Sequence, residues 1–168
     1  ALKDEVAMIA AHTGRPLDAQ WLTDFQQRRN AALLEQLTAI PHIHDAVHRI
    51  HADHGARIAC ASGADRFKVE MQLRKVGLID YFEGRIFSGY ETPRSKPFPD
   101  VYLAAAEALR VQPARCAVVE DTVTGVTAGV AAGAVVFAYD PIGDGAALRE
   151  AGAVEIFTSM ADLPLLMH

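Results

Sequence analysis

Two adjacent carboxylates, Glu120 and Asp121, directly follow the apolar run CAVV at residues 116–119. Such a run is typical of a buried strand, so its end would place two negative charges close together where burial strengthens their repulsion. A positive group is therefore expected to balance them. A divalent cation with oxygen ligands, such as Mg²⁺, satisfies this requirement. A helix-capping pair is the alternative interpretation of the same two residues.

Further polar groups follow two other strand-like runs. Ser62 and Gly63 come after RIACA at residues 57–61, just before a helical pattern. A serine there is typical of a helix N-cap, but its hydroxyl and the amides behind it also form an anion site that suits a phosphate. Lys96 follows GRIF at residues 84–87 in a loop rich in proline. That loop can hold the ammonium in one place, whereas a solvated surface lysine is the alternative.

An alternation of helices and apolar strands is expected to position these groups. Helices are predicted at residues 43–54, 65–75, 99–110, 123–132, 146–151 and from 160 onward, and strands at 57–61, 85–87, 116–119, 134–139 and 154–157. This order predicts an α/β fold, a Rossmann-like parallel sheet with helices on both faces. Ligands of such sheets bind at the carboxyl ends of the strands, so the polar groups should share one rim. Phosphate, lysine and magnesium together favour phosphoryl transfer.

Residues 1–40 differ from this pattern, because only helices are expected there. Asp18 is expected to cap the second of two helices. The chain begins at Ala1 directly in a helical pattern. The α/β core is therefore assigned to residues 41–168, and the helical stretch before it is treated as a separate part.

Composition and charge exclude several classes of protein. A length of 168 residues with 51% hydrophobic residues allows one domain with a substantial core and a small appendage. A net charge of −5 and a pI near 5.8 argue against a nucleic-acid partner. No apolar run is long enough for a membrane span, and no secretory signal pattern opens the sequence. Cys60 and Cys116 lack CxxC spacing and are expected to be buried reduced thiols, which fits a cytoplasmic protein.

Three segments in this order resemble motifs two, three and four of the haloacid dehalogenase-like superfamily: SGADR from residue 62, SKPFPDVYLAAAEAL from residue 95 and CAVVEDTVTGVTAGVAAGA from residue 116. The similarity is greatest to the branch of β-phosphoglucomutase and small sugar-phosphate phosphatases. It covers nearly the whole chain, and residues 1–40 resemble the second part of that branch's helical cap. The resemblance implies Mg²⁺-dependent hydrolysis of a small phosphate monoester through an aspartyl-phosphate. The expected partner is a small phosphorylated metabolite, with no nucleic acid and no membrane.

The resemblance also implies roles for single residues. The Ser62 hydroxyl and the Gly63 amide would bind a phosphoryl oxygen, and Lys96 would neutralise the nucleophile and the phosphate. Asp121 would bind Mg²⁺ directly, and Glu120 would bind it directly or through water. Magnesium would then be the positive partner that the carboxylate pair requires.

Several basic side chains have two interpretations each. Arg29 precedes Asn30 as a basic residue does in the mutase-like branch, where it faces the active site, so Arg29 is a candidate to bind a sugar hydroxyl, a carboxylate or a second phosphate. A solvated helix face is its alternative, and Arg66 and Arg94 have similar alternatives. His44, His48 and His51 share a face of the predicted helix at 43–54 and could chelate a transition metal, but a solvated face is favoured.

The family's first motif, a DxDGT-like segment whose first Asp is the nucleophile, is absent from the sequence. YDPIGDG at residues 139–145 has neither its spacing nor its place in the order. Without a nucleophile the chain alone should not turn over phosphate esters. In the family this motif lies on a central strand, between the strands that lead to Ser62 and to Glu120. Loss of the central strand would leave unpaired backbone groups on both of its neighbours. We therefore hypothesise that an N-terminal segment with this strand and the first cap helices lies outside the printed sequence.

Two other functions stay open. A phosphosugar mutase would use the same nucleophile, although Ala64 stands where the mutase usually offers a polar contact. A non-catalytic module that binds phosphorylated metabolites is the alternative from another class, if the nucleophile is truly absent. The sequence does not indicate the oligomeric state.

Overall fold

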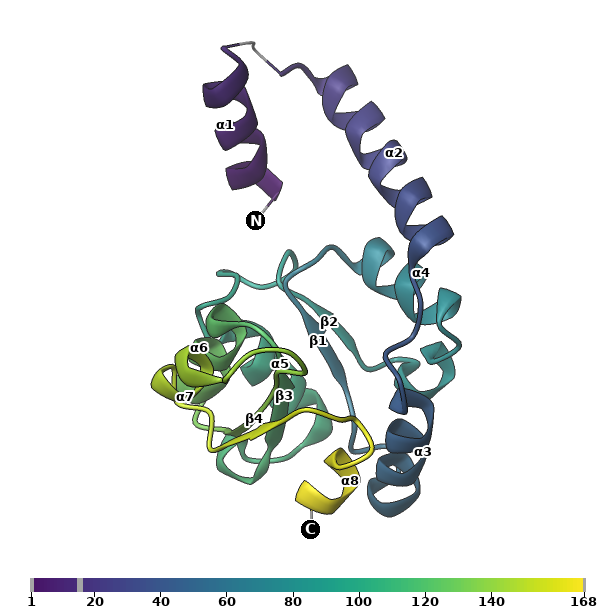
Figure 1. Ribbon diagram of the computed structural model, residues 1–168, viewed down its shortest axis with the longest axis vertical. Coiled ribbons are helices and arrows are strands. Elements are labelled where there is room, and N and C mark those ends of the chain that lie inside the picture. Colours follow the sequence, from purple (N-terminus) through teal and green to yellow (C-terminus); the bar gives the residue numbers. More distant parts are fainter. Residues whose placement is uncertain (1, 15–16, 168) are drawn as a thin grey trace.

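The computed structural model describes residues 2–14 and 17–167, so Ala1 lies outside the described residues. An α/β body carries the first two helices as a projecting arm (Figure 1). The strands are β1 (Cys60–Ser62), β2 (Ile86–Ser88), β3 (Ala117–Glu120), β4 (Val135–Tyr139) and β5 (Glu155–Phe157). The helices are α1 (Leu2–Thr13), α2 (Ala19–Gln36), α3 (Ile43–His54), α4 (Arg66–Lys75), α5 (Asp100–Leu109), α6 (Val123–Ala131), α7 (Ala146–Glu150) and α8 (Leu163–Leu166), with 3-10 turns η1 (Ile79–Phe82) and η2 (Pro113–Arg115).

The described strands form two separate parallel sheets. β1 pairs with β2, and β3, β4 and β5 form the second sheet in that order. Ser62 is in register with Ser88 in the first sheet, and Glu120 with Ala138 in the second. The predicted α/β fold with parallel strands is therefore confirmed, although the described strands do not join into one continuous sheet.

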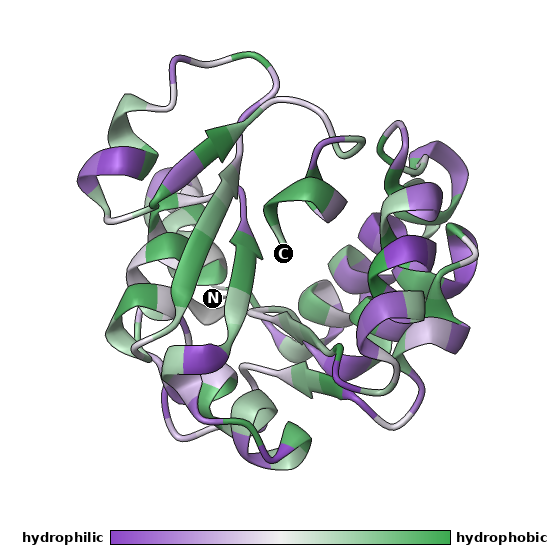
Figure 2. Cartoon of the chain, turned by 90° about the horizontal axis from the view of Figure 1, so that it is seen from below, coloured by the Kyte–Doolittle hydropathy of each residue, from purple (hydrophilic) through white to green (hydrophobic). Residues whose placement is uncertain are grey.

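The main core lies between the second sheet and the helices α5, α6 and α7 (Figure 2). Val101, Val126 and Val136 are fully buried there. The opposite face of β4 and β5 packs on a smaller cluster that includes Ala46 of α3 and Met160 and Leu163 near the C-terminus. Apolar residues are thus needed on both faces of β4, which explains its uninterrupted hydrophobic run.

The arm joins the body beside the loop that follows β1. Asp18 caps α2 as predicted, since its carboxylate accepts a hydrogen bond from the Trp21 amide at 2.8 Å. The Trp21 and Phe25 rings stack with centroids 5.1 Å apart. All residues of α2 are described and none is buried, but α2 contacts α4 in the body. The assignment of this arm as part of a cap stays a prediction.

The main differences from the predicted elements have local causes. β1 begins at Cys60 instead of Arg57, because the Arg57 amide still closes the preceding helical turn on the His54 carbonyl. α8 begins at Leu163 instead of Met160, with Pro164 in its first turn. None of the helices in the described part of the chain combines the length and the apolar character that crossing a membrane would require.

Candidate active site

The loop after β1 carries Ser62 and Gly63 at the rim of the body. α4 begins after this loop and is capped by Asp65, whose carboxylate accepts from the Lys68 amide at 2.9 Å. The N-cap interpretation of Ser62 is therefore wrong, because Asp65 performs that role. The Ser62 hydroxyl instead accepts from the Ala64 amide at 3.1 Å within the loop. Gly63 is exposed, and a side chain there would meet nothing within 4 Å.

The loop after β2 holds the Ser62 loop in place. Ser88 is 1% exposed, and its hydroxyl donates to the Ala64 carbonyl at 2.7 Å. The Gly89 amide donates to the Ser62 carbonyl at 2.7 Å, and a Cβ on Gly89 would lie 3.3 Å from the Gly63 Cα. Sequence reasoning missed Ser88. Its one signal was a serine at the end of a buried strand, where an unpaired hydroxyl would be costly.

We expect Ser88→Ala to weaken phosphate binding, because the Ala64 carbonyl loses its buried donor and the Ser62 loop loses one of its attachments. Loss of the buried hydrogen bond should cost about 1–3 kcal/mol of unfolding free energy. Denaturant unfolding and calorimetric titration with inorganic phosphate measure both effects. Ser159→Ala is the matched control, since the Ser159 hydroxyl accepts from the Ala161 amide in an exposed turn. Phosphate affinity equal to that of the unmodified protein would contradict the attachment role.

Lys96 lies between the two sheets and contacts both. Its ammonium donates to the Ala61 carbonyl of β1 at 3.3 Å and to the Tyr102 hydroxyl of α5 at 2.8 Å. It also forms a short ion pair with Glu120 at the end of β3. The Lys96 and Glu120 side chains are 12% and 9% exposed. Lys96 is thus a fixed, largely buried cation, as its proline-rich loop predicted, and it is the positive partner of Glu120 in this structure.

Every lone pair of the Glu120 carboxylate is directed to a donor. Oε1 accepts from Lys96 and from the Tyr102 hydroxyl. Oε2 accepts from the Asp121 amide and the Thr122 hydroxyl, each at 3.2 Å. Burial by itself would raise the pKa of Glu120, but the Lys96 charge and these hydrogen bonds outweigh it and hold the pKa below its usual range. Burial, followed by the neighbouring Glu120 charge, raises the pKa of Tyr102, so its hydroxyl keeps its proton.

Asp121 differs from its neighbour, because its side chain is exposed and accepts no hydrogen bond from the described residues. The described part of the chain holds no group of three or more His, Cys, Asp or Glu side chains arranged for a metal ion. A single carboxylate still fits Mg²⁺, which typically takes one or two carboxylates and completes its octahedron with waters and substrate phosphate. Asp121 is therefore the residue that is able to contact such an ion.

These groups surround one cleft of about 450 Å³. Its lining residues come from the ends of β1 and β3, from the loop before α5 and from the first turn of α6: Cys60, Ala61, Ser62, Gly63, Ser95, Lys96, Glu120, Asp121, Thr122 and Thr124. The structure thus brings together all the predicted core-site residues, as expected for the carboxyl ends of parallel strands. A hydroxyl, a fixed ammonium and an exposed carboxylate in one cleft suit the binding of a phosphate with a divalent cation.

A family model described as haloacid dehalogenase-like hydrolase matches residues 3–133. The chain belongs to the haloacid dehalogenase-like hydrolases. The resemblance that the three motifs carried is confirmed, and their residues line the cleft of this hydrolase.

Similar proteins support the same branch of the family. The hydrolase is 34% identical over 102 residues to a phosphorylated carbohydrates phosphatase of Thermotoga maritima, covering 60% of this chain and 47% of that one. It is 32% identical over 141 residues to a bifunctional riboflavin kinase/FMN phosphatase of Arabidopsis thaliana, covering 80% of this chain and 35% of that one. The structure of a HAD family hydrolase from Deinococcus radiodurans with bound phosphate and sodium is 32% identical, with a TM-score of 0.74 over 97% of this chain and 73% of that one. The hydrolase spans less than half the length of these two curated relatives.

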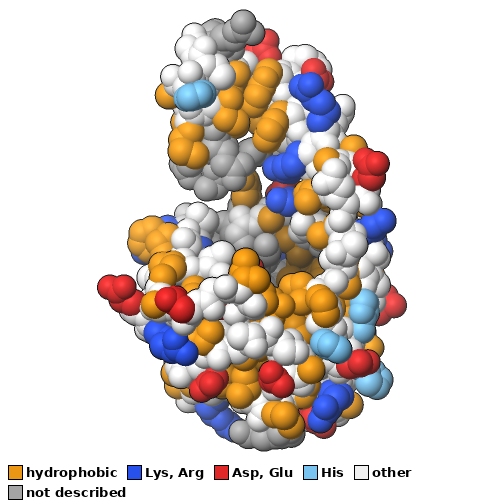
Figure 3. Space-filling model, viewed as in Figure 1, with side chains coloured by type: hydrophobic (Ala, Val, Ile, Leu, Met, Phe, Trp, Pro, Cys, Tyr) orange, Lys and Arg blue, Asp and Glu red, His pale blue; other side chains and the backbone are white. Residues whose placement is uncertain are grey.

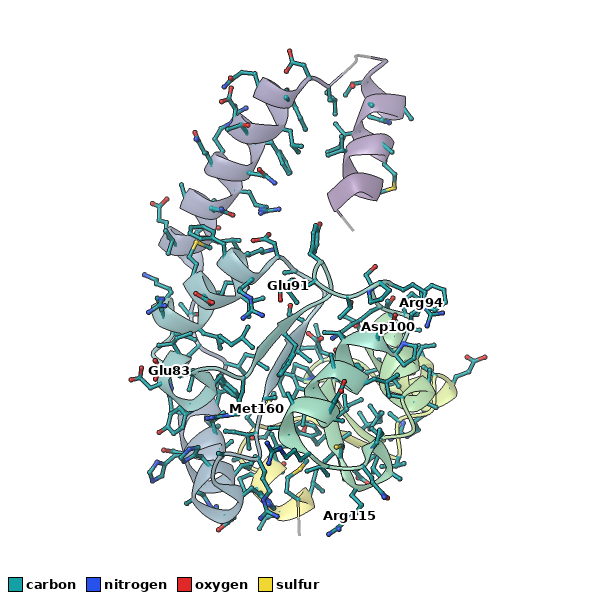
Figure 4. All side chains as sticks on the ribbon, turned by 180° about the vertical axis from the view of Figure 1, so that it is seen from behind. Glu83, Glu91, Arg94, Asp100, Arg115 and Met160 are labelled. Carbon is teal, nitrogen blue, oxygen red and sulfur yellow. The ribbon has the colours of Figure 1, made fainter. Side chains whose placement is uncertain are left out.

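Arg66 and Arg94 of the hydrolase are engaged by neighbouring carboxylates. Arg66 forms a two-pronged pair with Glu91, and its Nε donates at 2.6 Å. A hydrogen bond from Arg66 outweighs desolvation and lowers the pKa of Glu91. Arg94 pairs with Asp100 and lies beside it in Figure 4. These pairs favour the surface interpretation of both arginines over a substrate-binding role.

Arg29 of the arm lies beside the loop that follows β1. Its guanidinium is 22% exposed, donates to the Asn30 side chain at 3.1 Å and lies 4.0 Å from Asp65. Asp65 caps α4 directly after the Ser62 loop. Arg29 is therefore placed beside the Ser62 loop but not among the residues that line the cleft, and its contact with a substrate stays a prediction.

The histidines of α3 pack on the body. The ring of His44 is hydrogen-bonded to the Val76 carbonyl at 2.6 Å, and that of His48 to the Tyr81 hydroxyl at 3.2 Å. His51 meets the Tyr81 ring edge-on at a centroid distance of 5.3 Å. This face of α3 is therefore partly a packing surface instead of the fully solvated face that the sequence favoured.

The two cysteines are free and partly buried. Burial raises the pKa of both thiols, and the nearby Lys96 charge lowers that of Cys60 by a smaller amount. Reduced thiols were expected, although neither is fully buried.

Proposed function

We propose that this hydrolase is a Mg²⁺-dependent phosphatase that cleaves a small phosphate monoester of the sugar-phosphate type through an aspartyl-phosphate. One observation carries the proposal: Ser62 and Gly63, Lys96 and Asp121 line a single cleft although they come from separate parts of the sequence. The similarity to a phosphorylated carbohydrates phosphatase supports the substrate class.

The chain's own residues would hold the phosphate from two sides. The exposed Gly63 backbone and the Ser62 hydroxyl would donate to one phosphoryl oxygen. The Lys96 ammonium, fixed by Ala61 and Tyr102, would neutralise charge that builds up on the transferring group. Because phosphoryl transfer depends mainly on positioning and charge neutralisation, these contacts supply much of what the reaction requires.

Asp121 would hold Mg²⁺, with Glu120 contributing indirectly through its effect on Lys96. The ion supplies charge neutralisation at the phosphate when it is bound. Glu120 is engaged by four donors in this structure. Direct coordination by Glu120, one of the two roles that the family resemblance implies, would first require these donors to release it.

We propose that the nucleophilic Asp stands on a further strand between β1 and β3. The split of the described strands into two parallel sheets supports this placement, because β1 and β3 end at the same cleft. A strand there would pair with both edges and bring an aspartate beside Lys96. In the same proposal, residues 1–40 are part of a cap that places Arg29 over the substrate.

Release of inorganic phosphate from a panel of sugar phosphates, with Mg²⁺ and with a chelator, tests the function in the full natural protein. Intact-mass measurement of that protein tests for residues beyond the printed 168. Mg²⁺-dependent release is the expected result. Tight binding of sugar phosphates without release would instead favour the non-catalytic alternative.

Asp121→Asn is expected to weaken Mg²⁺ binding and to remove most Mg²⁺-stimulated activity, because it neutralises the exposed carboxylate. The loss should be about 10-fold to 100-fold, the range seen when metal-site groups are altered. Calorimetric titration with Mg²⁺ and assays over a Mg²⁺ series measure it. Asp162→Asn, on the turn before α8, is the matched control and should behave as the unmodified protein. Equal Mg²⁺ affinity in both variants would contradict the role of Asp121.

A further inference from the structure

Tyr102 lies at the centre of the charge network, but it does not line the cleft and its effect on Glu120 is not part of the proposed reaction. It is 9% exposed and stands in the first turn of α5, six residues after Lys96. Its hydroxyl accepts from the Lys96 ammonium at 2.8 Å and donates to Glu120 Oε1, to which Lys96 also donates. Tyr102 therefore closes a triangle of three buried polar groups.

A hydroxyl is the group that can complete this triangle. Lys96 offers only donors and the ionised Glu120 offers only acceptors, so a third member must both accept and donate. Phenylalanine would fill the same space but would provide neither contact. The Lys96 ammonium also lies 4.6 Å from the centre of the Tyr102 ring, so the aromatic face limits its position from another side.

Both carboxylates line the cleft, but the triangle engages only Glu120. Glu120 and Asp121 are adjacent, but Glu120 is held toward α5 by Lys96 and Tyr102, while Asp121 is exposed. We propose that the Tyr102 hydroxyl is a positioning group that keeps Glu120 on Lys96 and so leaves Asp121 as the main metal-binding carboxylate. The expected effect on metal binding rests on the proposed function. The link between Tyr102 and Glu120 holds whether or not that function is correct.

The consequence is specific. Without the Tyr102 hydroxyl, Glu120 has one donor fewer and is freer to turn toward Asp121. Two carboxylates at the cation then bind it more tightly than one, while Lys96 loses the fixed position from which it neutralises phosphate. Tyr102→Phe should therefore tighten Mg²⁺ binding and lower kcat, with a smaller effect on the KM for the phosphate ester.

Four forms of the full chain test the inference: the unmodified protein, Tyr102→Phe, Glu120→Gln and the double variant. Denaturant unfolding and calorimetric titration with Mg²⁺ are made on each. Tyr81→Phe is the matched control, since it removes a hydroxyl bonded to His48 and does not line the cleft. Because Tyr102 and Glu120 are in direct contact, the effect of the double variant on the unfolding equilibrium constant should differ from the product of the two single effects by at least about 3-fold. Mg²⁺ affinity and kcat of Tyr102→Phe should each change by about 10-fold.

The expected pattern is that Tyr102→Phe binds Mg²⁺ more tightly, and that this gain disappears in the double variant, because the glutamine side chain that replaces Glu120 there is neutral. Unfolding effects that are fully additive, or Mg²⁺ affinity of Tyr102→Phe equal to that of Tyr81→Phe, would overturn the inference. If the unmodified protein releases no phosphate while the unfolding coupling is present, the proposed function fails and the link between Tyr102 and Glu120 is supported.

Discussion

Lys96→Met is expected to remove most phosphatase activity and to destabilise the fold. The substitution deletes a cation that contacts β1, α5 and Glu120 together. Loss of a preorganised charge at the phosphate should lower kcat by about 100-fold to 1000-fold. Removing one partner of a buried pair should lower the unfolding free energy by about 3–5 kcal/mol, because the Glu120 charge is left uncompensated. Steady-state kinetics and denaturant unfolding measure the two effects.

The double variant Lys96→Met with Glu120→Gln separates these effects. It removes both charges, so stability should return to within about 1–2 kcal/mol of the unmodified protein. Activity should stay low, because the phosphate still lacks its ammonium. Recovery of kcat in the double variant would mean that Lys96 serves only to neutralise Glu120, which contradicts its proposed role at the phosphate.

Gly125→Ala is expected to disrupt the same network from the opposite side. A Cβ at Gly125 would lie 2.0 Å from the Glu120 Cδ and Oε2 atoms, so the carboxylate has to move. Alanine would favour helix α6 by about 1 kcal/mol over glycine. Displacing a buried, fully hydrogen-bonded carboxylate costs more than this, and a net loss of about 2–4 kcal/mol in unfolding free energy is expected.

Thermal and denaturant unfolding measure the effect of Gly125→Ala, and Gly63→Ala is its matched control for stability. A Cβ on Gly63 would meet nothing within 4 Å, so this control should change the unfolding free energy by less than about 0.5 kcal/mol. If Gly125→Ala were as stable as the unmodified protein, the carboxylate would have room to move, and the network around Glu120 would be less constrained than its contacts indicate.

The sequence was sufficient to predict the parallel α/β fold and the rim on which the site stands. Ser62 and Glu120 each end an apolar strand. Because the carboxyl ends of parallel strands meet at one edge, their common location could be predicted from the sequence. Lys96 was identifiable for a different reason, since the prolines on either side restrict the loop that holds it. Strand ends and restricted loops are local features, and local features can be read from residue order.

The partners of these groups were not predictable in the same way. The sequence favoured magnesium as the counter-charge of Glu120, whereas the structure pairs this residue with Lys96, which is 24 positions away. Tyr102 was not singled out from the sequence, because its hydrogen bonds depend on how α5 approaches β3. Such contacts arise from the packing of distant elements, which residue order alone does not specify.

The cleft takes its polar groups from both sheets. Helix α5 packs against β1 and β2 and, through Val101 and Tyr102, against the core of the second sheet, while α3 meets α8 elsewhere in the body (Figure 1). Figure 3 shows the same view with apolar side chains exposed among the charged groups of the surface. Among the described strands, Ser62 ends a strand of one sheet and Asp121 follows a strand of the other. A phosphate held by Ser62 and, through a cation, by Asp121 would contact both sheets at once, so its affinity for the cleft would also report whether a further strand has brought the two sheets into register.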